Sequence, residues 1–203
     1  MKKLIFATGN QGKLREIREI MGDLGMEILS TKEAGIDLSV EENGTTFREN
    51  AVIKASACAA ALPSDMDAIV MADDSGLEVD ALNKEPGVYS ARYMGEDTSY
   101  RIKNRNLVER LEGVPVEKRT ARFVCAIAAA TKDGQVFTTE GTIEGKIGYE
   151  ERGENGFGYD PIFYLPDMSR TTAELSPEEK NAISHRGNAL RAMKEIIRSN
   201  LKK

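Results

Sequence analysis

The stretch AIVMADDSGLEVD, residues 68–80, decides how the surrounding chain is organised. The apolar run 68–72 predicts a short buried strand, and LEVDAL, residues 77–82, predicts another. Two adjacent carboxylates, Asp73 and Asp74, stand between the predicted strands. Neighbouring carboxylates repel each other, and even one is costly to bury. The stretch therefore indicates either a solvated Asp-Asp-Ser-Gly turn or a ligand site at the end of a strand.

The segments on either side predict an α/β protein with a mixed central sheet flanked by helices. The Lys-Asp-Gly turn at 132–134 separates two strand-like segments and predicts a hairpin. Two capping boxes, Thr46 with Glu49 and Ser176 with Glu179, mark helix starts. We expect strands at residues 4–8, 26–30, 68–72, 77–82, 122–131 and 135–145, and helices after Asn10, after Thr46, over 98–111, after Ser176 and through Leu190 to the C-terminus.

The composition is typical of a soluble globular protein of one domain, or of one domain with a modest lobe. The chain has 203 residues, of which 40% are hydrophobic and 30% charged, and its formal net charge is -5. An acidic balance argues against general binding to a DNA or RNA backbone, which requires a basic face. It does not exclude an anionic small ligand, because a few converging lysines can dominate the local potential.

The two cysteines and the start of the chain bear on the cellular compartment. Cys58 and Cys125 are far apart in apolar surroundings, without a CxxC pair, so a zinc ribbon or thioredoxin-like motif is excluded. The apolar run at the start is too short for a signal peptide or a membrane span. We therefore expect reduced thiols, a cytoplasmic location and no membrane partner.

The segment TGNQGKLREI, residues 8–17, is the first candidate for ligand binding. A strand passes through a polar, glycine-containing turn into a helix, whose free N–H groups favour an anion, and Lys13 would add a positive charge. The segment is not a Walker A loop, because Leu14 stands where the hydroxyl residue is required. The alternative is an ordinary turn with a solvated lysine.

Carboxylates also precede the helix that begins after Thr46. Glu49 lies in its first turn, where an acid complements the helix dipole, but Glu41 and Glu42 lie before the cap and need another explanation. The paired aspartates, Asp73 and Asp74, could bind Mg²⁺, which takes oxygen ligands and keeps several waters.

Two later segments have features of a binding site for a flat, polar ligand. GENGFGYDPIF, residues 153–163, surrounds Phe157 with glycines, so that the ring could stack on a base. ELSPEEKNAISHRGNAL, residues 174–190, holds the only histidine, His185, beside Arg186, and both side chains suit a polar heterocycle or a phosphate. The alternatives are a phenylalanine that fills the core and a helix–helix corner with surface charges.

In this order, the segments resemble the inosine triphosphate pyrophosphatase family over nearly the whole chain. The resemblance rests on ATGNQGK, EENGTTFRENA, ADDSGLEVDAL, PGVYSARY, GFGYDPIF and ELSPEEKNAISHRG. It implies Mg²⁺-dependent hydrolysis of ITP, dITP and XTP to the nucleoside monophosphate and pyrophosphate, which keeps deaminated purines out of DNA and RNA. It also implies one domain over residues 1–203, an elongated α/β fold with the active site in a cleft between two lobes, and a homodimer.

The resemblance further implies roles for individual residues. Glu42 and Asp74 would hold Mg²⁺, with Glu41 and Asp73 as neighbours, and Asp74 would also orient and deprotonate the attacking water. Asn10 and Lys13 would be the main side-chain contacts of the triphosphate. The implied substrate-binding residues are Thr8, Gly9, Asn10, Gln11, Gly12 and Lys13 around the triphosphate, Lys54 and Lys180 as phosphate-neutralising lysines, Ser75 at the substrate, Phe157 against the purine with Gly158, Tyr159 and Asp160 completing that wall, and His185 and Arg186 at the base edge.

Selectivity is expected to depend on position 6 of the purine. ITP and XTP carry a carbonyl acceptor there, whereas ATP carries an amino donor that would face a donor such as Arg186. Two alternatives stay open, a nucleotide pyrophosphatase of the septum-inhibitor class that acts on modified or pyrimidine nucleotides, and a nucleotide sensor without turnover. The His185-Arg186 corner and GFGYDPIF speak against the first, and intact Glu42, Asp73 and Asp74 speak against the second.

Overall fold

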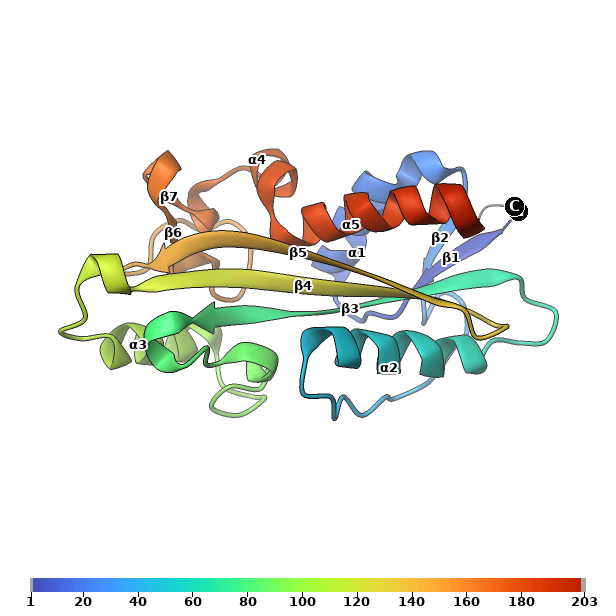
Figure 1. The fold of residues 1–203 in the computed structure, drawn as a ribbon, viewed down its shortest axis with the longest axis horizontal. Coiled ribbons are helices and arrows are strands. Elements are labelled where there is room, and N and C mark those ends of the chain that lie inside the picture. The colour runs from blue at the N-terminus through green and yellow to red at the C-terminus, as the bar shows by residue number, and fades with distance from the viewer. Residues whose placement is uncertain (1, 202–203) are drawn as a thin grey trace. The chain divides into compact units, whose positions relative to one another are not determined.

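The computed structural model of the protein describes residues 2–201 and contains one mixed seven-stranded sheet (Figure 1). Its strands are β1 (Lys3–Phe6), β2 (Glu27–Ser30), β3 (Ala68–Val79), β4 (Thr120–Thr131), β5 (Val136–Ile147), β6 (Phe163–Leu165) and β7 (Arg170–Thr171). The strand order is β2-β1-β3-β4-β5-β6-β7. β1 pairs in parallel with β2 and β3, whereas β6 pairs antiparallel with β5 and β7. The predicted α/β class with a mixed sheet is confirmed.

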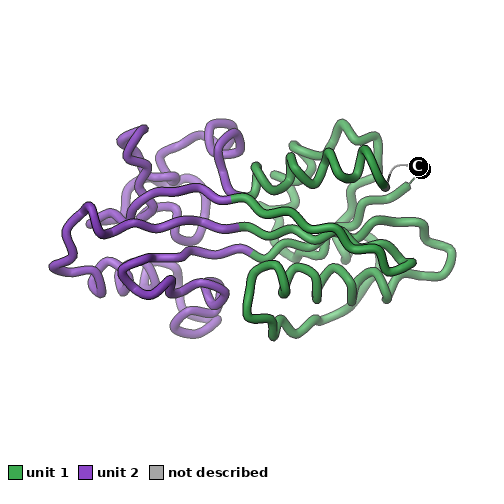
Figure 2. The backbone as a smooth tube through the Cα atoms, viewed as in Figure 1, with its two compact units in different colours: residues 1–74, 125–141, 186–203 green, residues 75–124, 142–185 purple. Residues whose placement is uncertain are grey.

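The chain forms two units, which Figure 2 distinguishes by colour. Unit 1 comprises Met1–Asp74, Cys125–Gly141 and Arg186–Lys203, and unit 2 comprises Ser75–Val124 and Thr142–His185. The long strands β3, β4 and β5 contribute residues to both units. Two of the points where the chain passes from one unit to the other, after Asp74 and after His185, fall inside motifs that the sequence singled out.

In unit 1 the sheet lies between helices. The helices of the chain are α1 (Gln11–Met21), α2 (Phe47–Ala60), α3 (Tyr100–Arg110), α4 (Pro177–Ile183) and α5 (His185–Ile196). Figure 1 shows α1 and α5 on one face of the sheet and α2 on the other. Leu4 and Ile69 of the sheet share a buried apolar cluster with Ile17 of α1 and with Leu190 and Met193 of α5. Burial of this cluster fixes the helices that carry the polar side chains of unit 1.

Unit 2 has a core of its own around the second half of β3. Leu77 and Val79 of β3 share a buried apolar cluster with Leu107 of α3, with Phe123 of β4 and with Phe163 of β6. The cluster includes Tyr159, so the segment GFGYDPIF is anchored in the core of unit 2.

The local sequence signals are confirmed by the structure. Thr46 and Ser176 each form a complete capping box, at the starts of α2 and α4. Residues 132–135 turn β4 into β5, and the N–H of Gly134 donates to the carbonyl of Thr131. Gly134 has a φ of 86°, a conformation that glycine adopts without strain.

The predicted break between two strands at the aspartates is wrong. β3 is one continuous strand from Ala68 to Val79, and the residues that follow, Asp80–Leu82, form a 3₁₀ turn rather than the end of a second strand. Asp73 and Asp74 therefore lie inside the strand and not at its end. The strand continues because each carboxylate has polar partners from a helix, as described below, so neither requires a solvated turn.

Membrane-spanning helices were searched for within residues 2–201. No helix there is both long enough and apolar enough to cross a lipid bilayer.

The cap of α2 provides a test of the fold. Thr46→Ala removes the hydroxyl that accepts from the N–H of Glu49 at 3.1 Å, so we expect the free energy of unfolding to fall by about 1 kcal/mol. Urea denaturation measures the change. Ser64→Ala in an exposed loop is the control and should stay within about 0.5 kcal/mol of the parent. Equal effects in the two variants would contradict the role of the cap.

Candidate active site

The two adjacent aspartates of β3 point to opposite faces of the sheet, because successive side chains of a strand alternate. Ile69 and Met71 belong to the cluster under α1 and α5, and Asp73 continues this row toward Lys13 of α1 and Arg186 of α5. Asp74 faces the other side, where Asn50 of α2 donates to it. The two carboxylates are therefore not a pair around one ligand.

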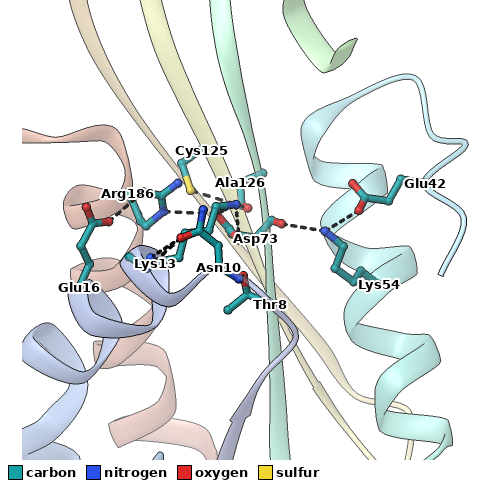
Figure 3. A network of polar contacts seen from close by, with 11 residues as sticks. Thr8, Asn10, Lys13, Glu16, Glu42, Lys54, Asp73, Cys125, Ala126 and Arg186 are labelled. Carbon is teal, nitrogen blue, oxygen red and sulfur yellow. Dashed lines mark hydrogen bonds and ion pairs between the residues drawn. The ribbon is translucent and has the colours of Figure 1, made fainter. Parts of the chain in front are cut away.

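Asp73 is the centre of a buried charge network, drawn in Figure 3. Its side chain is 1% exposed and lies 2.9 Å from the Lys13 ammonium and 3.3 Å from Nε of Arg186. Arg186 is also buried and donates to Glu16 of α1 at 2.8 Å. Burial alone would raise the pKa of Asp73, but the charges of Lys13 and Arg186 outweigh it and hold that pKa well below its usual range. The carboxylate is therefore ionised and compensated.

The turn before α1 is organised by Asn10. Its side-chain oxygen accepts from the backbone N–H groups of Gly12 and Lys13 at 2.8 and 3.1 Å, which caps the helix. Its own N–H donates to Oγ1 of Thr8. Gln11, with Gly12, forms the first turn of α1. The predicted phosphate loop is thus a capped helix start, in which the side chain of Asn10 already binds the N–H groups of Gly12 and Lys13.

Lys54 of α2 connects the segment before the helix with β3. Its ammonium lies 2.6 Å from Oε1 of Glu42 and 3.3 Å from the backbone carbonyl of Asp73 (Figure 3). Glu42 and Lys54 therefore form a partly exposed ion pair beside the strand.

Asp74 lies close to the charges of Glu42 and Lys54. Burial is the main cause that raises the pKa of Asp74 to about 6, and the negative charges of Glu42 and Asp73 raise it further. The hydrogen bond from Asn50 and the positive charge of Lys54 lower this pKa, but they do not cancel the effect of burial. The side chain of Asn50 donates to Oδ2 of Asp74 at 2.9 Å. A carboxyl group with such a pKa can accept a proton near neutral pH.

A cavity of about 310 Å³ in unit 1 brings several predicted residues together. Thr8, Gly9, Lys13, Glu42 and Lys54 line it, and Asp73 forms part of its wall. The wall also contains residues to which the sequence assigned no role, namely Ala7, Thr31, Leu38, Ser39, Val40 and Cys58. The cavity therefore has lysines, a hydroxyl and a helix start on its wall, which suit a phosphate group.

The donor set of unit 1 fits a hard cation with few protein ligands. Within residues 2–201 no group of three or more His, Cys, Asp or Glu side chains is arranged to hold a metal ion. Glu42 and Asp74 are two carboxylates close enough to interact, because the negative charge of Glu42 helps to raise the pKa of Asp74. Mg²⁺ is commonly held by one or two carboxylates, with waters and substrate phosphates as its other ligands.

In unit 2, Asp160 holds together the predicted base-binding segment. This carboxylate is 2% exposed and accepts from Nζ of Lys180 at 2.6 Å, from the N–H of Phe157 at 2.8 Å and from Oγ1 of Thr172 at 2.8 Å. A Cβ atom at Gly156 would lie 2.2 Å from Oδ2 of Asp160, so only glycine fits there. Lys180 thus binds the carboxylate that holds the Phe157 segment. The predicted neutralisation of phosphates by Lys180 stays a prediction.

The ring of Phe157 is exposed to solvent rather than buried in the core. It is 41% exposed, with the ammonium of Lys180 5.1 Å from its centroid. Tyr159, two residues later, is buried, donates to the carbonyl of Ser90 at 2.7 Å and packs edge-on against Tyr100. The prediction that Phe157 faces a ligand agrees better with this exposure than a core role does.

The remaining predicted residues are divided between the units. Ser75 and Gly158 belong to unit 2, Ser75 within β3 and Gly158 beside the ring of Tyr100. His185 is buried in unit 2 and stacks on Phe123 at 5.0 Å, whereas Arg186 belongs to unit 1. His185 thus stacks on Phe123, whereas the guanidinium of Arg186 contacts Asp73 and Glu16.

Sequence reasoning missed Glu16 and Asn50. Glu16 is the second carboxylate of Arg186, and Asn50 is the donor to Asp74. Helix periodicity offered a signal for Asn50, because it lies four residues before Lys54 and so on the same side of α2. Glu16 lies three residues after Lys13 on α1, but its partner Arg186 is 170 residues away in sequence, so the contact between them could not be read from periodicity.

Comparison with known proteins places the chain among relatives of similar length. A model of the Ham1 family matches residues 4–196. The dITP/XTP pyrophosphatase of Clostridium perfringens is 48% identical over 204 residues and all of both chains, and that of Bacillus subtilis is 46% identical over 97% of this chain and 98% of its own. The structure of the Staphylococcus aureus Ham1 protein has a TM-score of 0.86 at 43% identity and covers 97% of this chain and 98% of its own.

The buried network around Asp73 can be tested through Arg186. Arg186→Met leaves the buried Asp73 with less compensation, so we expect a loss of about 3–5 kcal/mol in the free energy of unfolding. Urea denaturation measures it, with Arg18→Met as the matched control on α1. Arg18 and its partner Glu33 have half-exposed side chains, and the control should lose no more than about 1 kcal/mol. A similar loss in both variants would show that the Asp73 network adds nothing to stability.

Proposed function

The chain belongs to the Ham1 family, and from this membership and the site in unit 1 we infer that it is a dITP/XTP pyrophosphatase. It hydrolyses ITP, dITP and XTP to the nucleoside monophosphate and pyrophosphate, and so removes deaminated purine nucleotides before they enter nucleic acids. The resemblance to the inosine triphosphate pyrophosphatases is thereby confirmed.

The observation that carries the proposal is the cavity in unit 1. Lys13 and Lys54, from α1 and α2, line it together with Thr8 and Gly9 at the capped start of α1. Each lysine is already held by a carboxylate, so it is positioned before substrate arrives. Reactions at phosphorus depend mostly on such positioning and on neutralisation of charge.

We assign proton transfer to Asp74. Its raised pKa suits a group that accepts a proton from an attacking water near neutral pH, and the hydrogen bond from Asn50 fixes its orientation. Attack of this water on a phosphorus atom of the triphosphate chain and departure of pyrophosphate would give the monophosphate.

Glu42 and Asp74 are the residues that we propose for Mg²⁺. When bound, the ion would neutralise charge on the phosphate oxygens and polarise them. The chain's own contribution is to hold the two carboxylates, one before α2 and one in β3, on the α2 side of the sheet.

The purine is assigned to residues of unit 2. The exposed ring of Phe157 would stack on the base, and Asp160 would hold the segment that carries it. His185 is proposed at the base edge. Arg186 shares its guanidinium between Asp73 and Glu16, so its reading of the purine 6-position stays a prediction.

Cytoplasmic location and a homodimer complete the proposal. The homodimer is proposed from the resemblance to the inosine triphosphate pyrophosphatase family, and the location from the expected reduced state of the two cysteines.

The proposed reaction predicts a pattern of substrates. Pyrophosphate release should be strong with ITP, dITP and XTP in the presence of Mg²⁺, weak with ATP and GTP, and absent when EDTA replaces Mg²⁺. A coupled pyrophosphate assay at equal nucleotide concentrations measures the rates. Equal release from ATP and ITP, or release of orthophosphate alone, would contradict the proposal.

Asp74 can be tested by an isosteric change. Asp74→Asn keeps the size of the side chain but removes the proton acceptor and a metal ligand, so we expect kcat for ITP to fall at least about 10²-fold. Far-ultraviolet circular dichroism should show an unchanged fold. Asp133→Asn, in the exposed β4–β5 turn, is the control and should keep parental kcat. Full turnover by Asp74→Asn would exclude Asp74 as the base.

A further inference from the structure

Asn50 is a buried amide whose two ends contact two different segments of the site. Its side chain is 1% exposed in the first half of α2. Its oxygen accepts from the backbone N–H of Gly44 at 2.8 Å, and its nitrogen donates to Oδ2 of Asp74 at 2.9 Å. One neutral side chain thus connects the segment that contains Glu42 with the carboxylate in β3.

The segment before α2 packs closely on this amide. A Cβ atom at Gly44 would lie 2.7 Å from Oδ1 of Asn50 and 2.7 Å from Cβ of Glu49, so only glycine allows the approach. The close approach holds the backbone two residues after Glu42 against α2. An ionised aspartate at position 50 could accept from Gly44 but could not donate to Asp74.

Lys54 also joins the two segments, but in a different way. It is an ammonium group that contacts Glu42 and the carbonyl of Asp73, and it lines the cavity that suits phosphate. An anionic ligand would attract Lys54 away from Glu42, whereas the neutral amide of Asn50 has no such attraction. A bound phosphate would therefore weaken the connection through Lys54 more than the connection through Asn50.

We propose that Asn50 is a positioning residue for the proposed metal and water site, which sets the carboxylates of Glu42 and Asp74 relative to each other. It acts through Gly44 on one side and through Oδ2 of Asp74 on the other, and it touches neither substrate nor metal itself. This inference rests on the proposed function, since it assigns a role within that same site.

The test compares two substitutions that separate the contacts of Asn50. Asn50→Ala removes both hydrogen bonds. Asn50→Asp keeps the acceptor for Gly44, loses the donor to Asp74 and adds a carboxylate. Asn188→Asp is the matched control, because Asn188 is exposed, its oxygen accepts from Arg191 and an aspartate keeps that acceptor while adding the same charge. Thermal denaturation first verifies that each variant is folded.

Binding of Mn²⁺ to the nucleotide-free protein, followed by electron paramagnetic resonance, reports on the carboxylates directly. We expect the Kd of Asn50→Ala to rise about 10-fold or more, because loss of a group that orients metal ligands typically costs that much. Asn50→Asp should bind Mn²⁺ at least as tightly as the parent, through its added carboxylate. Asn188→Asp should bind like the parent.

Steady-state kinetics with ITP and Mg²⁺ give the second measurement. In both Asn50 variants we expect kcat to fall about 10- to 100-fold while KM stays within about threefold, since the orientation of Asp74 is lost and the phosphate-side lysines remain. Tight binding of Mn²⁺ combined with low kcat in Asn50→Asp is a result that a merely structural role would not produce.

Several outcomes would overturn the inference. Parental kcat in Asn50→Asp would show that the donor to Asp74 is dispensable, and parental Mn²⁺ affinity in Asn50→Ala would show that the carboxylates need no such connection. Absence of Mn²⁺ binding by the parent protein would remove the site itself. If the parent binds Mn²⁺ but releases no pyrophosphate from ITP, the proposed function fails, and the Mn²⁺ affinities of the variants still decide the role of Asn50.

Discussion

The alternation of side chains along β3 is the constraint on which the site of unit 1 depends. Two adjacent acids in one continuous strand must face opposite sides of the sheet, so each needs its own polar partners. α1 and α5 supply Lys13 and Arg186 to Asp73, and α2 supplies Asn50 to Asp74. The pKa of Asp73 is thereby lowered, whereas the pKa of Asp74 is raised. The different environments of the two aspartates follow from their positions in the pleat.

The charge network also explains how the ammonium of Lys13 could leave Asp73 without destabilising the fold. Lys13 pairs with Asp73, which Arg186 contacts as well. If a phosphate draws Lys13 toward the cavity, Asp73 would keep the buried guanidinium and would not become an uncompensated charge. Arg186 in turn has Glu16 as a second partner. A move of Lys13 from Asp73 to a phosphate would therefore need no rearrangement of the core.

Sequence reasoning succeeded where the determinants are local and failed where they are not. The capping boxes at Thr46 and Ser176 and the turn before Gln135 depend on neighbouring residues, and all were predicted correctly. The break at Asp73 and Asp74 was wrong, because the partners that allow the strand to continue come from distant helices. The same distance concealed the contacts of Arg186. The family resemblance supplied the reaction, but it could not show that Arg186 meets Asp73.

The continuity of β3 also bears on how such a chain can change in length during evolution. Insertion or deletion of one residue between Ala68 and Asp73 would exchange the faces of the two aspartates, and would move each apolar side chain of the strand to the opposite, equally buried face. The polar partners of both carboxylates and the packing of the strand would then be lost together. In exposed turns such as residues 132–135, side chains do not alternate between two faces of a sheet, so extra residues can be accepted there. Variation in length among relatives should therefore collect in the turns, with the strand kept at constant length.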